Sequence, residues 1–160
     1  MLKLVIAGCL LLSAAASSSF GLFRNQISRE GVKDFQDSLA ADRQKHIDEV
    51  NQMIKGREND KAEDVYKNLK YIGGFNAGLL PKIMNKWSVA LGVSCGHCHE
   101  IGSWDRDSKP EKEIARKMAA MSPVILNYLR TIKELKNQNP IVNCTTCHRG
   151  QVKPAIDMAN

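Results

Sequence analysis

Two short segments of this 160-residue chain carry the same pattern of chemically versatile residues. The pattern is Cys-x-x-Cys-His, and it occurs in "VSCGHCHEIG" at residues 93–102 and in "VNCTTCHRG" at residues 142–150. The two copies use four of the five cysteines in the chain. Three kinds of chemistry fit such a pattern: attachment of two covalent haems, binding of zinc, and redox reactions of thiols.

The histidine that follows each cysteine pair favours haem attachment. In haem c the two thiols add across the vinyl groups, and the adjacent histidine is then held beneath the iron. The predicted attachment cysteines are Cys95, Cys98, Cys144 and Cys147, and the predicted iron-binding histidines are His99 and His148. The motifs therefore predict two covalently bound haem c groups as cofactors.

The alternative chemistries explain less of the pattern. Zinc ribbons also contain Cys-x-x-Cys pairs, but they need no histidine after each pair. Thioredoxin-like motifs lie between a strand and a helix, and this sequence has no strand pattern. Two structural disulfides would suit an exported chain, but each would close a tight, strained loop and would leave the two histidines unexplained.

Each haem iron has a second axial position, which a methionine sulfur can fill. Met84 lies on the apolar face of a predicted helix that ends just before the first motif. A turn of the chain at Gly92 would lay the haem against that helix, with the sulfur opposite His99. Met84 is therefore the favoured second ligand of the first iron.

Periodicity leaves the second ligand of the other iron open. Met118 and Met121 lie on the same face of a later predicted helix, and helical spacing does not separate them. Met53 and Met158 are the remaining candidate methionines, although a methionine on an amphipathic helix is usually part of an apolar core. His46 is a further candidate ligand, but a histidine in so charged a segment is more often solvated.

The first motif is preceded by the clearest predicted helix, over residues 79–92. Its apolar residues recur at helical spacing, Pro81 suits the first turn, and Gly92 suits the C-terminal end. Upstream, residues 29–56 predict a loosely amphipathic helix or helix pair, and residues 62–72 predict a shorter helix before a glycine-containing loop.

The second motif is preceded by a predicted helix within residues 100–137. Ser108 and Glu111 form a predicted capping box, and Pro123 should kink or divide the helix. No segment shows the alternation of a strand. The predicted fold is all-α, with short helices packed around two covalently bound c-type haems and few or no strands.

The N-terminus predicts export. Lys3 is followed by the short apolar run "LVIAGCLLLSAAA", which together predict a signal peptide over residues 1–19. Cys9 lies in a segment that resembles a lipoprotein box, but lipidation is the less favoured reading because the apolar run continues past it. A periplasmic or exported location follows, with tethering to the membrane through Cys9 as the alternative.

Composition narrows the function classes. Hydrophobic residues make up 43% of the chain and aromatic residues only 6%, which predicts a small folded core that a prosthetic group would enlarge. The net charge of +6 is not organised into basic runs with aromatic residues, so nucleic acid is not an expected partner. The expected organisation is the signal peptide, a charged helical segment over residues 20–60 and a dihaem cytochrome c domain over residues 61–160.

The stretches "MNKWSVALGVSCGHCH" and "ARKMAAMSPVILNYL…VNCTTCHRGQVKP" resemble the cytochrome subunit of photosynthetic reaction centres and its relatives, over roughly residues 64–155. Members usually contain four units of a methionine-bearing helix, a turn and Cys-x-x-Cys-His, so this chain is similar to one half of such a subunit. The resemblance implies Met84 and Met118 as the axial methionines, with Met121 as the alternative to Met118.

The motifs and the resemblance together predict an electron carrier rather than an enzyme. Its expected partners are redox proteins, among them a membrane-bound electron-transfer complex. The rival prediction is a dihaem peroxidase-like enzyme or a gas sensor with one open haem iron. Such an enzyme would need acid–base groups beside the open iron, and the sequence offers no obvious set.

Overall fold

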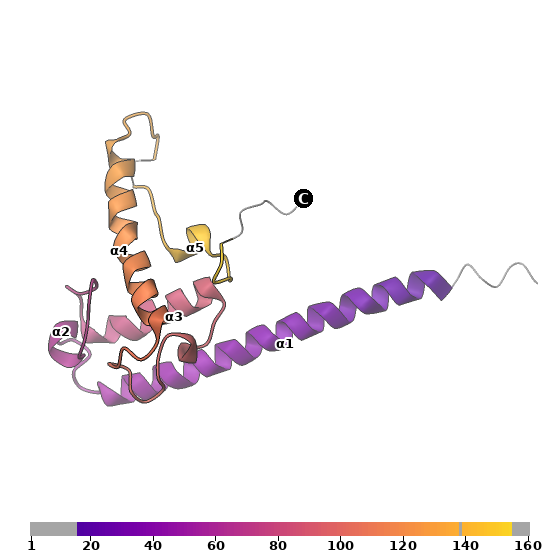
Figure 1. Ribbon diagram of the computed structural model, residues 1–160, viewed down its shortest axis with the longest axis horizontal. Helices are drawn as coiled ribbons and strands as arrows, with labels where there is room; N and C mark the ends of the chain where they lie inside the picture. Colours follow the sequence, from indigo (N-terminus) through magenta and orange to yellow (C-terminus); the bar gives the residue numbers. More distant parts are fainter. Residues whose placement is uncertain (1–15, 138, 155–160) are drawn as a thin grey trace, which may run out of the picture. The chain divides into compact units, whose positions relative to one another are not determined.

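The computed structural model describes residues 16–137 and 139–154. Most of the predicted signal peptide, including Cys9, and the candidate Met158 lie outside the described residues. The helices are α1 (Ala16–Met53), α2 (Ala62–Val65), α3 (Leu80–Leu91), α4 (Pro110–Thr131) and α5 (Cys144–Cys147), with 3-10 turns η1 (Ala77–Leu79) and η2 (Cys95–His97) (Figure 1). Within the described part of the chain, extended pairing is limited to two isolated bridges. The all-α prediction is confirmed.

The chain divides into two compact units between Ser38 and Leu39. The first unit contains the N-terminal part of α1. The second unit contains the end of α1 and all later elements, including both motifs. The last turns of α1 thus belong to the unit that holds the motifs.

Helix α1 is one continuous helix rather than a pair. In its last turns the side chains of Leu39, Arg43 and His46 are buried, which is the spacing of one helix face. Two of these three residues are polar. The buried face of this helix is therefore not marked by hydrophobic residues alone. This explains why the sequence showed only loose amphipathicity.

Helix α2 is shorter than predicted, because it ends at Val65 instead of continuing to residue 72. Tyr66 is extended, and Asn68 and Tyr71 have positive φ angles of 62° and 65°. Long-range hydrogen bonds accompany this conformation: Tyr66 donates to the Ala77 carbonyl, and the Asn68 side chain donates to the carbonyl of residue 105. These contacts outweigh the local preference for helix.

Helix α3 agrees with its prediction. Pro81 lies in the first turn, and Gly92 closes the helix in the left-handed conformation with φ of 65°. The amide N–H of Val93 then donates to the carbonyl of Ser88, which satisfies one of the last carbonyls of the helix. This turn leads the chain directly into the first motif.

Helix α4 corrects two expectations. The predicted capping box is wrong, because the N-cap is Lys109 rather than Ser108 and no side chain caps the helix. Division at Pro123 is also wrong, since the helix continues past it to Thr131. The residues before Pro123 include strong helix formers, and they offset the one hydrogen bond that the proline cannot donate.

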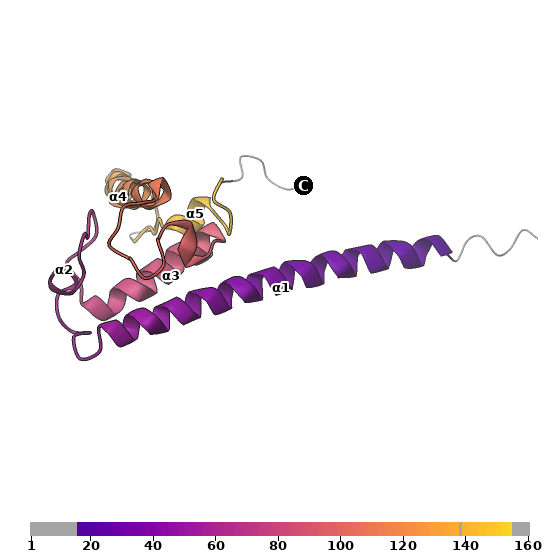
Figure 2. The same cartoon turned by 60° about the horizontal axis from the view of Figure 1, so that its bottom comes forward.

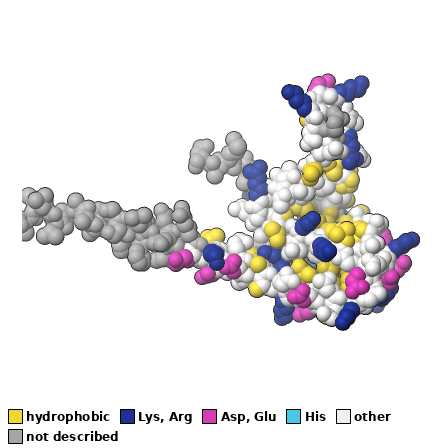
Figure 3. Space-filling view, turned by 180° about the vertical axis from the view of Figure 1, so that it is seen from behind, with side chains coloured by type: hydrophobic (Ala, Val, Ile, Leu, Met, Phe, Trp, Pro, Cys, Tyr) yellow, Lys and Arg dark blue, Asp and Glu magenta, His cyan; other side chains and the backbone are white. Residues whose placement is uncertain are grey.

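The apolar core of the second unit is small. Among the described residues, the buried apolar side chains are Leu39, Ile54, Ala62, Ala77, Pro81 and Ala90, and no large side chain is fully buried. In two views α3 runs alongside the end of α1, and α5 lies next to the C-terminal end of α3 (Figures 1 and 2). The space-filling view shows apolar side chains gathered on one face of this unit, with basic side chains among them (Figure 3).

Candidate functional site

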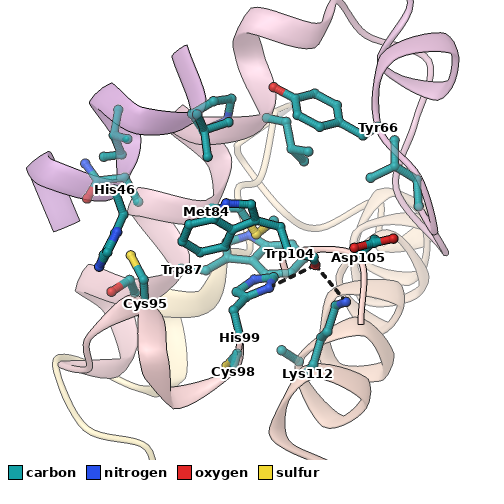
Figure 4. Close-up of a pocket in the computed structure, with 18 of the residues that line it drawn as sticks. His46, Tyr66, Met84, Trp87, Cys95, Cys98, His99, Trp104, Asp105 and Lys112 are labelled. Carbon is teal, nitrogen blue, oxygen red and sulfur yellow. Dashed lines mark hydrogen bonds between the residues drawn. The ribbon is translucent and has the colours of Figure 1, made fainter. Parts of the chain in front are cut away.

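A cavity of about 430 Å³ lies in the second unit, within the size range of sites for small molecules and cofactors. It is enclosed by the end of α1, the segment after α2, helix α3, the first motif and the beginning of α4. Its lining includes all four residues that the sequence singled out for the first haem: Met84, Cys95, Cys98 and His99 (Figure 4). The structure therefore brings these four residues together.

The first motif is held in place from α1. The motif begins as a 3-10 turn, and just after it the amide N–H of His99 donates to the carbonyl of Cys95 over 3.1 Å. The amide N–H of Cys95 donates to Oδ2 of Asp42 over 3.2 Å, and Arg43 donates to the carbonyl of Val93 over 3.5 Å. Sequence reasoning missed this role of α1. The only sign of it in the sequence is the spacing of Asp42, Arg43 and His46, which places them on one helix face.

The His99 imidazole is oriented by a backbone carbonyl. Its Nδ1 lies 3.3 Å from the carbonyl oxygen of Trp104. A carbonyl only accepts hydrogen bonds, so Nδ1 carries the proton and the lone pair of Nε2 is left for a metal. Burial lowers the pKa of His99, and the nearby Lys112 ammonium acts in the same direction, so the imidazole is neutral near pH 7 as a metal ligand requires.

His46 is buried, and the expectation of a solvated histidine is wrong. The residue lines the cavity and is only 6% exposed. Its Nδ1 lies 2.7 Å from a Glu49 oxygen and its Nε2 lies 3.5 Å from an Asp42 oxygen. The ring of Trp104 meets both His46 and His99 edge-on, with centroids 5.5 Å apart in each pair. His46 is thus tied to carboxylates of its own helix and supports the Trp104 wall of the cavity.

Two buried cations also line the cavity, Lys112 and Arg116 of α4. Both contact Asp107, at 3.1 Å from Lys112 and 2.8 Å from Arg116, and Lys70 lies 2.8 Å from the same carboxylate. The hydrogen bond from Lys70, together with those from Lys112 and Arg116, holds the pKa of Asp107 well below its usual range.

Basic residues elsewhere on α4, just after it and near the second motif differ from Lys112 and Arg116. They are exposed, and none of the following lines this cavity: Lys117, Lys133, Arg149 and Lys153. The sequence sign that Lys112 and Arg116 act together was their separation by four residues, about one helical turn. That spacing becomes informative only when it is known which face of α4 the protein covers.

The second motif forms the single helical turn α5. Asn143 caps it in a reciprocal capping box with Thr146: its side chain accepts from the amide of Thr145 over 3.0 Å, and its own amide donates to the Thr146 hydroxyl over 3.1 Å. Nδ1 of His148 lies 3.1 Å from the carbonyl oxygen of Gln151. The two motif histidines thus have the same orientation, with Nδ1 toward a carbonyl and Nε2 left for a metal.

The second set of predicted residues does not line the described cavity. Cys147 is exposed, and Cys144 and His148 are half-buried. On α4, Met118 and Met121 are 40% and 41% exposed. They belong to a stripe of exposed apolar side chains at helical spacing: Ile114, Met118, Met121, Val124 and Tyr128. Such a stripe is costly in water, so it fits a region that an apolar group covers.

The thiols do not resemble redox-active cysteines. All four motif cysteines are free. Burial raises the pKa of Cys95, Cys98 and Cys144, whereas redox-active thiols have a lowered pKa. In the part of the chain that the structure describes, no three His, Cys, Asp or Glu side chains converge as a metal site, so the zinc alternative gains no ligand set.

A comparison with known families decides the relationship. The family described as "Photosynthetic reaction centre cytochrome C subunit" matches residues 23–158. The chain belongs to this family. The resemblance recognised in the two motif segments is thereby confirmed, and membership in this family implies covalently bound c-type haem as the cofactor.

One curated relative is the photosynthetic reaction center cytochrome c subunit of Roseobacter denitrificans. It is 30% identical over 101 residues, which cover 59% of this chain and 26% of the relative. The chain therefore spans about a quarter of the length of the curated relative that it matches. Among the described residues, no helix combines the length and the hydrophobicity needed to cross a membrane.

Proposed function

We propose that this protein is a small exported dihaem c-type cytochrome that transfers electrons through two His/Met-ligated haems. The observation that carries the proposal is the convergence of Met84 with Cys95, Cys98 and His99 on one cavity. Three of these residues come from the motif, and Met84 comes from the preceding helix. Family membership supplies the class of cofactor.

At the first site, Cys95 and Cys98 would hold the haem covalently. His99 would bind the iron through Nε2, and Met84 would bind it through sulfur. When bound, the haem supplies an iron that takes up and releases one electron. The protein residues orient it, with Trp104 fixing the imidazole and the apolar lining of α3 excluding water.

At the second site, Cys144 and Cys147 would hold the haem, with His148 and Met118 as ligands of its iron. The capped turn of α5 presents both cysteines within one helical turn. The exposed apolar stripe of α4 that contains Met118 supports a haem covering that surface. Met121 lies on the same stripe with equal exposure, so it is the alternative ligand.

With a histidine and a methionine bound to each iron, neither haem would offer a free position to peroxide or oxygen. We therefore propose an electron carrier and not an enzyme. We place its partners among redox proteins, including a membrane-bound electron-transfer complex, because the curated relative is named as a reaction center subunit. We further propose a periplasmic or exported location, in which residues 1–19 act as the signal peptide.

The test is an intact mass measurement of the mature protein combined with its optical spectrum. The expected result is a mass increase of two haems that survives denaturation, and a ferric spectrum that is entirely low-spin. A high-spin component would favour the peroxidase-like enzyme or gas sensor. A colourless protein that contains zinc would overturn the proposal.

A further inference from the structure

The carbonyl oxygen of Trp104 accepts two hydrogen bonds. One comes from Nδ1 of His99 over 3.3 Å, and the other comes from Nζ of Lys112 over 2.9 Å. The close-up shows both bonds meeting at this oxygen (Figure 4). Lys112 is therefore separated from the imidazole of His99 by a single oxygen atom.

The Lys112 ammonium is fixed at this place. An ammonium has three N–H donors, and here they face three oxygens: Trp104 O, Arg106 O at 2.6 Å and Asp107 Oδ1 at 3.1 Å. The residue is buried, with a relative exposure of 7%. The ammonium of a surface lysine is mobile and solvated, whereas these three oxygens hold the Lys112 ammonium beside the cavity.

Neighbouring charges do not cancel this one. Lys112, Arg116 and Lys70 share Asp107. Arg116 also contacts Glu113 at 3.3 Å, so three cations face two carboxylates in this cluster. If a neutral residue replaces Lys112, Arg116 and Lys70 still pair with Asp107. The change would therefore remove one full positive charge from the cavity wall.

We propose that Lys112 is a positioning residue that raises the reduction potential of the first haem. This inference rests on the proposed function, because it requires a haem held by His99. Two effects act in the same direction. A buried positive charge favours the reduced iron, which carries one positive charge less. A cation bound to the Trp104 carbonyl also weakens the pull of that oxygen on the His99 proton, so the imidazole donates less electron density to the iron.

The size of the effect follows from the charge. A unit charge acting over roughly 10 Å at an effective dielectric constant of about 20 changes a one-electron equilibrium by about tenfold. Tenfold corresponds to about 59 mV for a one-electron couple. Replacing Lys112 by a neutral residue should therefore lower the potential of one haem by about this amount.

The experiment is a redox titration of the mature holoprotein and of its Lys112→Met variant, fitted with two components. The equilibrium constant for reduction of one haem should fall by about tenfold in Lys112→Met. This haem should be the one whose spectrum Met84→Ala also alters. Lys117→Met is the matched control, because it removes the same charge from an exposed position of the same helix. Its effect should be small, since solvent and salt screen exposed charges.

Two further variants separate charge from shape. Lys112→Arg keeps a cation and N–H donors and should retain the wild-type potential. Lys112→Gln keeps a donor without the charge and should lower the potential as Lys112→Met does. It also provides the measurement if Lys112→Met fails to fold.

Several outcomes would overturn the inference. These are an unchanged or higher potential in both neutral variants, an equal fall in Lys117→Met, or a fall in Lys112→Arg as large as in Lys112→Met. Failure of the proposed function looks different: the mass of the wild-type protein would then lack a haem at the first motif. A haem that is present but insensitive to Lys112 contradicts the inference alone.

Discussion

The amide N–H of Gly150 donates a 2.7 Å hydrogen bond to the carbonyl oxygen of Ala90. This bond joins the turn after the second motif to the end of the helix that leads into the first. Gly92 allows the approach, because a Cβ at that position would overlap the carbonyl oxygen of Gly150. The two motifs are therefore neighbours in space, although 45 residues lie between Cys98 and Cys144.

The first prediction concerns this contact. Gly92→Ala should destabilise the holoprotein by about 2–5 kcal/mol, since alanine is strained at positive φ by about 1–2 kcal/mol and the overlap with Gly150 adds about 1–3 kcal/mol. The measurement is unfolding by denaturant. Gly74→Ala is the control, because Gly74 also has a positive φ, of 74°, but a Cβ there meets nothing within 4 Å. Equal losses in the two variants would mean that the Gly150 contact contributes nothing.

The second prediction concerns Met84. Met84→Ala should remove the sulfur ligand while leaving α3 intact, because alanine is a good helix former. The first haem should become high-spin and bind carbon monoxide. The reduced variant should therefore bind one molecule of carbon monoxide per chain, whereas the reduced wild-type protein should bind none. The second haem serves as the internal reference and should keep its spectrum. Wild-type spectra and no carbon monoxide binding in the variant would exclude Met84 as a ligand.

The third prediction separates two methionines of α4. Met118→Ala should open the second iron to carbon monoxide, whereas Met121→Ala should leave it closed. The two side chains have nearly equal exposure, 40% and 41%, so loss of packing should affect both variants alike. Any difference in ligand binding then reports coordination. The reverse result would move the ligand by one helical turn to Met121.

If neither α4 variant opens the iron, the second haem has another ligand or is open in the wild type. His46 is a poor substitute, because it lies in the first cavity and both of its ring nitrogens face carboxylates. A natural open position would revive the enzyme alternative. It would also appear as carbon monoxide binding by the wild-type protein.

The fourth prediction concerns pH. The cations around Asp107 hold its pKa below the unfolded value of about 3.9, so the ionised carboxylate stabilises the fold above that pH. This contribution is lost as the pH falls through the lowered pKa. Asp107→Asn should therefore lower the denaturation midpoint most at neutral pH, and the gap to wild type should narrow below about pH 4.

The control for this prediction is Asp34→Asn at an exposed position of α1. This variant should leave the denaturation midpoint unchanged both at neutral pH and below about pH 4. A constant gap between wild type and Asp107→Asn from pH 7 to pH 3 would contradict the prediction. It would indicate that the geometry of the side chain matters and its charge does not.

The sequence by itself determined the local features of this protein. Cys95, Cys98 and His99 are adjacent in the chain, so their chemistry can be read without a fold. Met84 and Gly92 also belong to one short helix and its cap, where periodicity and turn geometry act over a few residues. The family could be recognised for the same reason, since its recurring unit is a contiguous segment.

Only the tertiary structure decided which polar residues are inside. His46 and Lys112 look like solvated helix residues in sequence, because the burial of a polar side chain depends on which segments of the fold pack over it. Lys112 is satisfied by the carbonyls of Trp104 and Arg106, and Asp42 of α1 is satisfied by the amide of Cys95. Gly92 likewise has a second reason to be glycine, which appears only once Gly150 is packed against it. Hydrogen bonds between distant segments carry no periodic signal, and so they become visible only when the chain has folded.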